Sequence, residues 1–253
     1  MTQIVGFAGK KQSGKNTACN YILALKLAEL GVCKKSRLSQ TGEVEVTDVF
    51  GERANEDDWF AFSKENVNIN KLTEECLGPY IKMYGLADTL KDMCVDIFGI
   101  PRNQCYGTDE EKNSLTDIRW ENIPHTDGKS GAMTAREVLQ HVGTDIFRQI
   151  DPNIWIKSLL RKINKDSPEV ALVCDVRFAN EILGLQGAQG FIVGLTRDPY
   201  QNKDQHASEQ EITKALKLCD TIVDNKNMDI KTQIQHIHSS LEHLPNVIPK
   251  MEK

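Results

Sequence analysis

A glycine- and lysine-rich segment near the start of the chain has the spacing of a phosphate-binding loop. Residues 9–17 read GKKQSGKNT, a G-x-x-x-x-G-K pattern between an apolar run at 3–8 and a helical pattern at 15–30. In such a loop successive backbone N–H groups point at phosphate oxygens, and the lysine, here Lys15, reaches the β- and γ-phosphates of a nucleotide. The alternative is a glycine-rich turn with a solvated lysine, but the position between strand and helix favours the phosphate site.

The residue after the lysine departs from the pattern, which places Ser or Thr there as a magnesium ligand. Asn16 occupies that position and Thr17 follows it, so either Thr17 binds the metal or a carboxylate elsewhere helps to hold it. Asp175 is the candidate carboxylate, because it ends the apolar run 170–175 at the carboxyl edge of the expected sheet, where open α/β sheets bind ligands. A helix N-cap or a turn is the alternative role for Asp175. The predicted metal ligands are therefore Thr17 and Asp175.

Several basic residues stand at the ends of expected strands or in the first turns of expected helices. Transfer of a phosphoryl group needs fixed positive charge, because the transition state spreads negative charge over several oxygens. The candidates are Lys91, Arg136, Arg177 and Arg197. For any one of them a solvated surface charge is the commoner fate, but several together favour a phosphate site. Trp155 could stack on a base, although a tryptophan of the core is the more ordinary outcome.

Short apolar runs alternate with longer helical patterns, which is typical of βαβ units and a mostly parallel sheet. Five strands are expected, at residues 3–8, 80–84, 170–175, 191–196 and 221–224. The expected helices lie at residues 15–30, 87–98, 134–150, 154–164, 179–186, 208–217 and 228–241. The sequence thus predicts the α/β class.

Two stretches, 33–78 and 100–133, are longer than ordinary connections and are predicted to be insertions. In the first, the alternation of Val44 and Val46 after the turn-like Thr41 and Gly42 favours a β-hairpin. The polar stretch 198–207, between the fourth strand and the next helix, is predicted to be a lid that closes and excludes water.

Composition excludes several classes of protein. The 253 residues, 40% of them hydrophobic, suffice for a sizeable core, and a net charge of -5 argues against a protein that coats nucleic acid. The seven cysteines are scattered without a C-x-x-C pair, so reduced thiols are expected rather than a zinc site. No basic leader precedes the first apolar run and no apolar run could span a bilayer, which predicts a soluble intracellular protein.

Taken in order, these motifs resemble the deoxynucleoside monophosphate kinases of tailed bacteriophages. The LQ-x-x-GTD block at 139–145 and the D-x-R block at 175–177 are more specific than the phosphate loop itself. The remaining blocks of the resemblance are 9–17, 86–91, 155–157, Glu181, Arg197, 206–209 and 224–225. They run from the first strand to the last and cover most of the chain outside the two insertions.

The resemblance implies a P-loop NTPase fold of the nucleoside monophosphate kinase type, with a five-stranded parallel sheet flanked by helices. It also implies transfer of the γ-phosphoryl group of ATP to a deoxynucleoside monophosphate (dNMP), with Mg²⁺ as cofactor, for the supply of DNA precursors. By position, ATP is expected at Gly14, Lys15, Asn16, Thr17, Gly143, Thr144 and Arg197. The dNMP is expected at Lys11, Lys91, Arg136, Trp155, Arg177 and Glu181, and the expected catalytic residues are Lys15, Arg136 and Arg177. Asn16 is unsurprising in this family, where Asp or Asn commonly follows the lysine.

The same resemblance implies a single P-loop kinase domain over residues 1–253. ATP and a dNMP are the expected partners, a homodimer is a family-based expectation, and neither nucleic acid nor a membrane is expected to bind. The expected location is the cytoplasm, that of the host if a phage encodes the chain. Two alternatives stay open: another small-molecule P-loop kinase, resembling dephospho-coenzyme A kinases, and a regulator that binds ATP without transferring its phosphate to a small acceptor.

Overall fold

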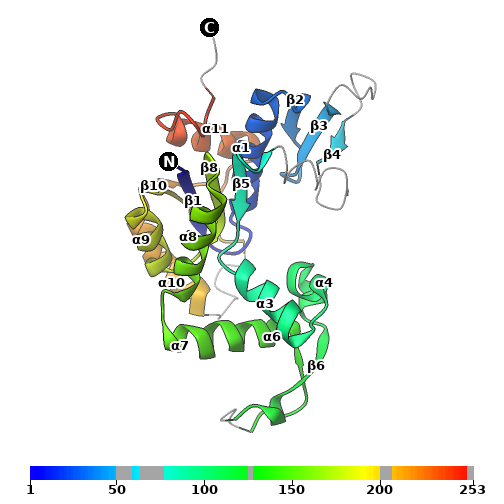
Figure 1. Cartoon of the computed structure of the whole chain (residues 1–253). Helices are drawn as coiled ribbons and strands as arrows, with labels where there is room; N and C mark the ends of the chain where they lie inside the picture. The colour runs from blue at the N-terminus through cyan, green and yellow to red at the C-terminus, as the bar shows by residue number, and fades with distance from the viewer. Residues whose placement is uncertain (50–58, 63–76, 125–127, 200–206, 250–253) are drawn as a thin grey trace. The chain divides into compact units, whose positions relative to one another are not determined.

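A computed structural model describes residues 1–49, 59–62, 77–124, 128–199 and 207–249, which divide into two compact units (Figure 1). The first unit combines Met1–Gly85 with Leu160–Lys253, and the second is the continuous stretch Leu86–Leu159. In the described part of the chain, no helix is both long enough and apolar enough to cross a membrane.

A five-stranded parallel sheet is the centre of the first unit. Its order is β10-β9-β1-β8-β5, and every neighbouring pair is parallel. The strands are β1 (Gln3–Gly9), β5 (Ile81–Tyr84), β8 (Val170–Val176), β9 (Phe191–Leu195) and β10 (Thr221–Val223). The central strands β1 and β8 are apolar on both faces, as expected of strands buried between helices. All five expected strands and the expected sheet are confirmed.

Helices cover both faces of this sheet. Helices α1 (Lys15–Glu29) and α11 (Ile230–Leu241) share one core with Val5 and Phe7 of β1. Residues alternate between faces along a strand, so Gly6 points to the other side, where a Cβ atom would lie 3.2 Å from the Cδ1 of Leu185. Leu185 belongs to α9 (Ala179–Gly187), and α10 (Ala207–Ala215) follows on the same side, packed against α9 and β1.

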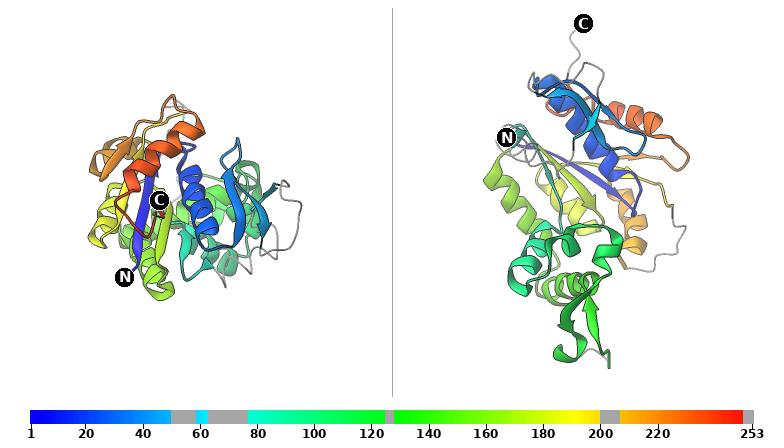
Figure 2. Two further views of the ribbon diagram at one scale, coloured as in Figure 1. Left: turned by 90° about the horizontal axis from the view of Figure 1, so that it is seen from above. Right: turned by 90° about the vertical axis from the view of Figure 1, so that its right-hand side faces the viewer.

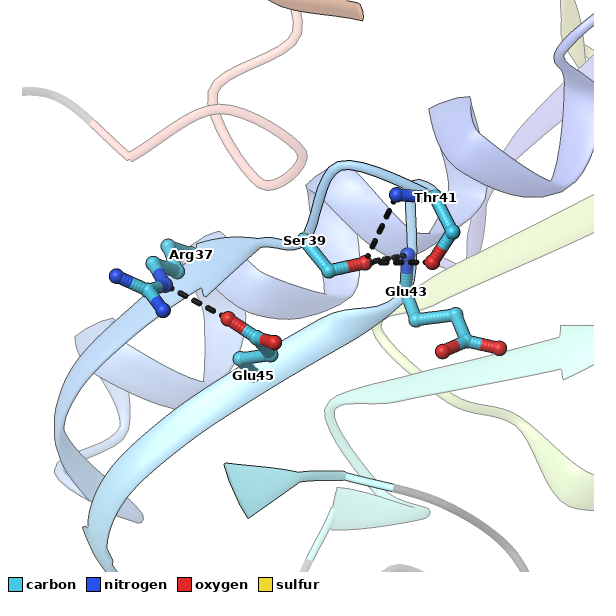
Figure 3. Close-up of polar contacts among 5 residues, drawn as sticks. All are labelled: Arg37, Ser39, Thr41, Glu43 and Glu45. Atoms are coloured by element: carbon cyan, nitrogen blue, oxygen red, sulfur yellow. Dashed lines mark hydrogen bonds and ion pairs between the residues drawn. The ribbon is translucent and has the colours of Figure 1, made fainter. Parts of the chain in front are cut away.

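The stretch 33–78, predicted as an insertion, contains the predicted hairpin. Strands β2 (Cys33–Leu38) and β3 (Val44–Val49) pair antiparallel, and β4 (Phe60–Ala61) adds a third strand that the sequence did not indicate. Figure 3 shows the turn, in which the Ser39 Oγ accepts hydrogen bonds from the N–H groups of Thr41 (3.2 Å) and Glu43 (3.1 Å). Across the strands, Arg37 Nε lies 2.7 Å from Glu45 Oε2. The rest of this insertion, 50–58 and 63–76, lies outside the described residues.

The hairpin lies against α1, as both views in Figure 2 show. The Asn20 Nδ2 donates to the carbonyl oxygen of Gly42 (2.9 Å), and the Ser36 Oγ donates to that of Ala24 (2.7 Å). Gly42 has a φ of +83°, and a Cβ atom there would lie 2.5 Å from the Oγ1 of Thr17. The turn of the hairpin therefore touches the first turn of α1, directly after the phosphate loop.

The second unit has its own core, which includes Leu90, Cys94, Trp120, Val138 and Trp155. The stretch 100–133, predicted as an insertion, folds into elements too short for the sequence pattern to reveal. Its elements are α4 (Arg102–Tyr106), α5 (Asp109–Lys112), β6 (Leu115–Arg119), the 3-10 turn η2 (Trp120–Asn122) and the start of β7 (Ala132–Thr134). Strands β6 and β7 pair antiparallel. The helix α3 (Asp88–Phe98) and the start of α8 (Ile154–Asp166) also belong to this unit.

The expected helix at 134–150 is continuous, but its middle is a π-helix. It consists of α6 (Ala135–Gln140), the π-helix η3 (His141–Phe147) and α7 (Arg148–Ile150). Leu90 packs so closely on Gly143 that a Cβ atom on Gly143 would lie 2.6 Å from the Cδ2 of Leu90. The carbonyl oxygen of Gly143 accepts a hydrogen bond from the indole N–H of Trp155 (3.0 Å). Such π segments are rare in proteins as a whole, and those that occur are often at functional sites. This one coincides with the LQ-x-x-GTD block.

The close approach of Gly42 to Thr17 predicts an unequal effect of two alanine substitutions. Gly31 also has a positive φ, of +66°, but a Cβ atom there would meet nothing within 4 Å. Backbone strain should therefore cost both Gly31→Ala and Gly42→Ala about 1–2 kcal/mol. Gly42→Ala should lose about 1 kcal/mol more in the free energy of unfolding in urea, because its Cβ overlaps Thr17. Equal losses in the two variants would contradict the close packing of hairpin and helix.

Candidate active site

The phosphate loop connects β1 to α1 and wraps around its own lysine. Lys15, 7% exposed, donates from Nζ to the carbonyl oxygens of Gly9 (2.7 Å) and Lys10 (2.5 Å). Gly14 precedes α1 with a φ of +97°, in the left-handed region that favours glycine. This places the ammonium group inside the loop, beside the positive end of the helix dipole, where phosphate oxygens are favoured.

The opposite side of the loop is packed against other elements of the first unit. A Cβ atom on Gly9 would lie 2.8 Å from the carbonyl oxygen of Leu195, so only glycine allows this approach. The carbonyl oxygen of Ser13 accepts from the Nδ2 of Asn225 (2.7 Å), and that of Gly14 accepts from the Nε2 of Gln233 (3.2 Å). These two carbonyl groups therefore face the body of the unit.

Asp175 lies near the carboxyl end of β8, within electrostatic range of Cys19 in α1. Burial raises the pKa of the Cys19 thiol well above its usual value, and a hydrogen bond with Cys174 and the negative charge of Asp175 act in the same direction. The positive charge of Lys15 opposes them. Strands β1 and β8 are parallel neighbours, so Asp175 near the end of β8 and Lys15 in the loop after β1 lie at the same edge of the sheet.

The two predicted metal ligands differ in how well they fit a magnesium ion. The half-buried carboxylate of Asp175 has the hard oxygen chemistry that Mg²⁺ prefers, at the sheet edge that carries Lys15. The Oγ1 of Thr17 lies against Gly42 of the hairpin, so Thr17 would have to change rotamer to turn its hydroxyl elsewhere. Asn16 occupies the position where the loop pattern has Ser or Thr, and it is exposed at the start of α1.

Glu181 fixes the turn that carries Arg177. Its Oε2 accepts from the backbone N–H groups of Arg177 (2.9 Å) and Phe178 (3.0 Å), and the side chain is 3% exposed. A carboxylate at the N-terminus of α9 also interacts favourably with the helix dipole. The burial of Glu181 therefore has a structural cause, and its contact with a dNMP stays a prediction.

Arg197 joins the end of β9 to the segment after β10. Its Nε donates to the carbonyl oxygen of Asn225 (3.1 Å) and its Nη2 to that of Met228. The next residue, Asp198, forms an ion pair of 2.6 Å with Lys10 of the phosphate loop. Of the predicted lid at 198–207, residues 200–206 lie outside the described part of the chain. Lys11, the remaining predicted residue of the first unit, is half-buried within the loop itself.

The predicted cations of the second unit contact residues of the stretch 100–133, and Lys91 also pairs with Asp88 of α3 at 3.8 Å. Lys91 Nζ lies 4.8 Å from the ring centroid of Tyr106, which carries a favourable cation–π contact. Arg136, in the first turn of α6, donates from Nε to Asn113 Oδ1 (2.8 Å) and from Nη2 to Asp109 Oδ1 (2.7 Å). Both cations are thereby oriented before any substrate binds, and Tyr106, Asp109 and Asn113 have no role in the sequence prediction.

Gly143, Thr144 and Trp155 meet around the π-helix of the second unit. Trp155 is 6% exposed, and its ring lies 5.5 Å from that of Phe147 between centroids. Thr144 is exposed. The burial and hydrogen bonding of Trp155 match the core role that the sequence left open, while its contact with a base, like the contacts of Gly143 and Thr144 with ATP, stays a prediction.

Sequence reasoning missed the roles of Asn225 and Gln233. Both side chains are buried, at 0% and 1% exposure, which is unusual for amides. Asn225 was part of the family resemblance but had no role assigned, and Gln233 looks like any polar residue of an amphipathic helix. The signal that could have found Gln233 is its place on the buried stripe of α11 with Ile237 and Leu241.

Comparison with known proteins agrees with this geometry. The family model described as deoxynucleotide monophosphate kinase matches residues 3–234. A protein of Acanthamoeba polyphaga mimivirus, provisionally named a deoxynucleotide monophosphate kinase, is 30% identical over 159 residues, 56% of this chain and 75% of the relative. The deoxynucleoside-5'-monophosphate kinase of Escherichia phage T5 is 46% identical over 50 residues, 19% of this chain and 20% of the relative. The chain belongs to the deoxynucleotide monophosphate kinase family.

Proposed function

We propose that this kinase transfers the γ-phosphoryl group of ATP to a deoxynucleoside monophosphate, giving ADP and a deoxynucleoside diphosphate. The observation that carries the proposal is the loop at residues 9–17, with Lys15 enclosed at the N-terminus of α1. The family match over residues 3–234 disfavours both a dephospho-coenzyme A kinase and a regulator without transferase activity.

On the donor side, the loop is proposed to bind the phosphates of ATP through Gly14, Lys15, Asn16 and Thr17. The ammonium group of Lys15 would leave the carbonyl oxygens of Gly9 and Lys10 for the β- and γ-phosphates. Gly143, Thr144 and Arg197 are further donor-side proposals. Magnesium, held by Asp175 and by Thr17 after a change of rotamer, would neutralise phosphate charge.

On the acceptor side, the residues proposed to bind the dNMP phosphate are Lys91, Arg136 and Arg177. Arginine suits this task because its planar guanidinium holds two phosphate oxygens at once. Lys11, Trp155 and Glu181 complete the proposed acceptor set. No covalent intermediate is needed: the charges of Lys15, Arg136 and Arg177 align the two substrates and stabilise the transferring group. The host cytoplasm and a homodimer remain part of the proposal.

Loss of the loop lysine should abolish turnover without unfolding the chain. In a coupled assay for ADP with Mg-ATP and each dNMP or rNMP in turn, we expect particular dNMPs to stimulate release. Lys15→Ala should lower kcat about 100-fold or more, since it removes a charge that stabilises the transition state. The matched control is Lys217→Ala, at an exposed lysine of the 3-10 turn η4 (Leu216–Leu218). ATP binding without stimulation by any monophosphate would overturn the proposed acceptor.

Arg136→Ala should act mainly on the acceptor. We expect the KM for the dNMP to rise about tenfold or more, because one charge-assisted contact to phosphate is lost, while the KM for ATP stays near that of the wild type. Arg119→Ala is the control, since Arg119 is an exposed arginine of the same unit that pairs with Glu121 at 3.0 Å. Indistinguishable dNMP kinetics in the two variants would remove Arg136 from the site.

Two substitutions separate the capping role of Glu181 from a role in dNMP binding. Glu181→Ala leaves two N–H groups without their acceptor and should cost about 1–3 kcal/mol of stability. Glu181→Gln keeps an acceptor oxygen but loses the charge that favours the N-terminus of α9, so it should cost less stability than Glu181→Ala, while loss of a charge-assisted contact should raise the KM for the dNMP about fivefold. If Glu181→Gln left that KM unchanged, the residue would be a cap alone.

A further inference from the structure

Two buried amides form a continuous hydrogen-bonded chain behind the phosphate loop. The Nδ2 of Asn225 donates to the carbonyl oxygen of Ser13 and to the Oε1 of Gln233, each at 2.7 Å. The Nε2 of Gln233 donates in turn to the carbonyl oxygen of Gly14 (3.2 Å). The Oδ1 of Asn225 accepts the backbone N–H of Arg197 (2.9 Å). All the partners belong to the first unit.

The chemistry of the partners fixes the orientation of both amides. A backbone carbonyl can only accept, so the nitrogen of each amide has to face the loop. The N–H of Arg197 can only donate, so the oxygen of Asn225 has to face β9. Both hydrogens and the oxygen of the Asn225 amide are therefore used, and this satisfies a group that would be costly to bury unpaired.

The loop fits tightly against this pair of amides. A Cβ atom on Gly14 would lie 2.6 Å from the Nε2 and 2.7 Å from the Oε1 of Gln233. The last glycine of the motif thus leaves room for Gln233 as well as adopting its φ of +97°. A loop that binds phosphate must keep its carbonyl dipoles away from the anion, since a carbonyl oxygen turned inward repels it.

We infer that Asn225 and Gln233 are positioning residues for the donor nucleotide. They hold the carbonyl groups of Ser13 and Gly14 on the far side of the loop, so that its N–H groups are arranged for phosphate before ATP arrives. This inference rests on the proposed binding of ATP phosphates at residues 9–17. The part of the nucleotide that these two residues affect is the polyphosphate group rather than the base. A ligand with the phosphates but no base therefore tests the inference.

The experiment compares the binding of ATP and of inorganic tripolyphosphate to the full chain by calorimetry. The variants are Gln233→Met, which keeps the length of the side chain but removes both polar atoms, and Asn225→Asp, which removes the donor to Ser13. The control is Gln235→Met, at an exposed glutamine two residues further along α11. We expect both variants to weaken ATP and tripolyphosphate by the same factor, about tenfold, and the control to leave both unchanged.

Kinetics provide the second measurement. The KM for ATP should rise in both variants while the KM for the dNMP stays within about twofold of the wild type, a separation that general loss of folding does not produce. The thermal unfolding curve of each variant is measured first, and binding and kinetics are then compared at a temperature at which every variant is folded. If Asn225→Asp does not fold, Gln233→Met alone decides the question.

The remaining outcomes overturn the inference in distinguishable ways. Weakening of ATP alone, with tripolyphosphate unaffected, would mean that the amides act on the nucleoside part. Unchanged binding of both ligands in Gln233→Met, with Lys15→Ala weakened for both, would reject the positioning role and leave the proposed function standing. Binding of both ligands that does not depend on Lys15 would reject the proposed site itself.

Discussion

The direction of a few backbone carbonyl groups decides whether a glycine-rich turn can bind phosphate. The N–H groups of residues 9–17 can converge only if the carbonyl groups between them find partners elsewhere. Here Lys15 donates hydrogen bonds to two of these carbonyl groups from inside the loop. Asn225 and Gln233 donate to two more from its other side. These partners come from α1, the segment after β10, and α11. The order of the parallel sheet, with β1 in its middle, lets one short loop reach them.

A similar arrangement recurs among the predicted cations, because none of them stands alone. Arg197 bonds to the carbonyl groups of Asn225 and Met228, Arg136 to Asp109 and Asn113, and Glu181 fixes the turn of Arg177. Holding a long side chain before substrate arrives reduces the entropy lost on binding. Both partners of Arg136 and the aromatic partner of Lys91, Tyr106, lie in the stretch 100–133, which gives that stretch a physical role in each proposed contact.

The central sheet was predictable because its strands are apolar runs bounded by polar residues, and five such runs were found from the pattern alone. The phosphate loop was equally visible, since its glycines and lysine have a fixed spacing. The elements α4 and α5 were not visible, because four or five residues carry no helical period. The π-helix was not visible either: hydrophobic periodicity does not separate it from an α-helix, and its contacts with Leu90 and Trp155 form only in the folded chain.

The second unit is one uninterrupted stretch, Leu86–Leu159, and no strand of the five-stranded sheet lies within it. This stretch lies between β5 and β8 in the sequence, so its length and residues can change without breaking a strand pairing of that sheet. The cost of closing a longer segment grows only with the logarithm of its length. Lys91, Arg136 and Trp155 all lie in this stretch. A single replacement within this stretch could thus change these three positions at once while the phosphate loop stays intact.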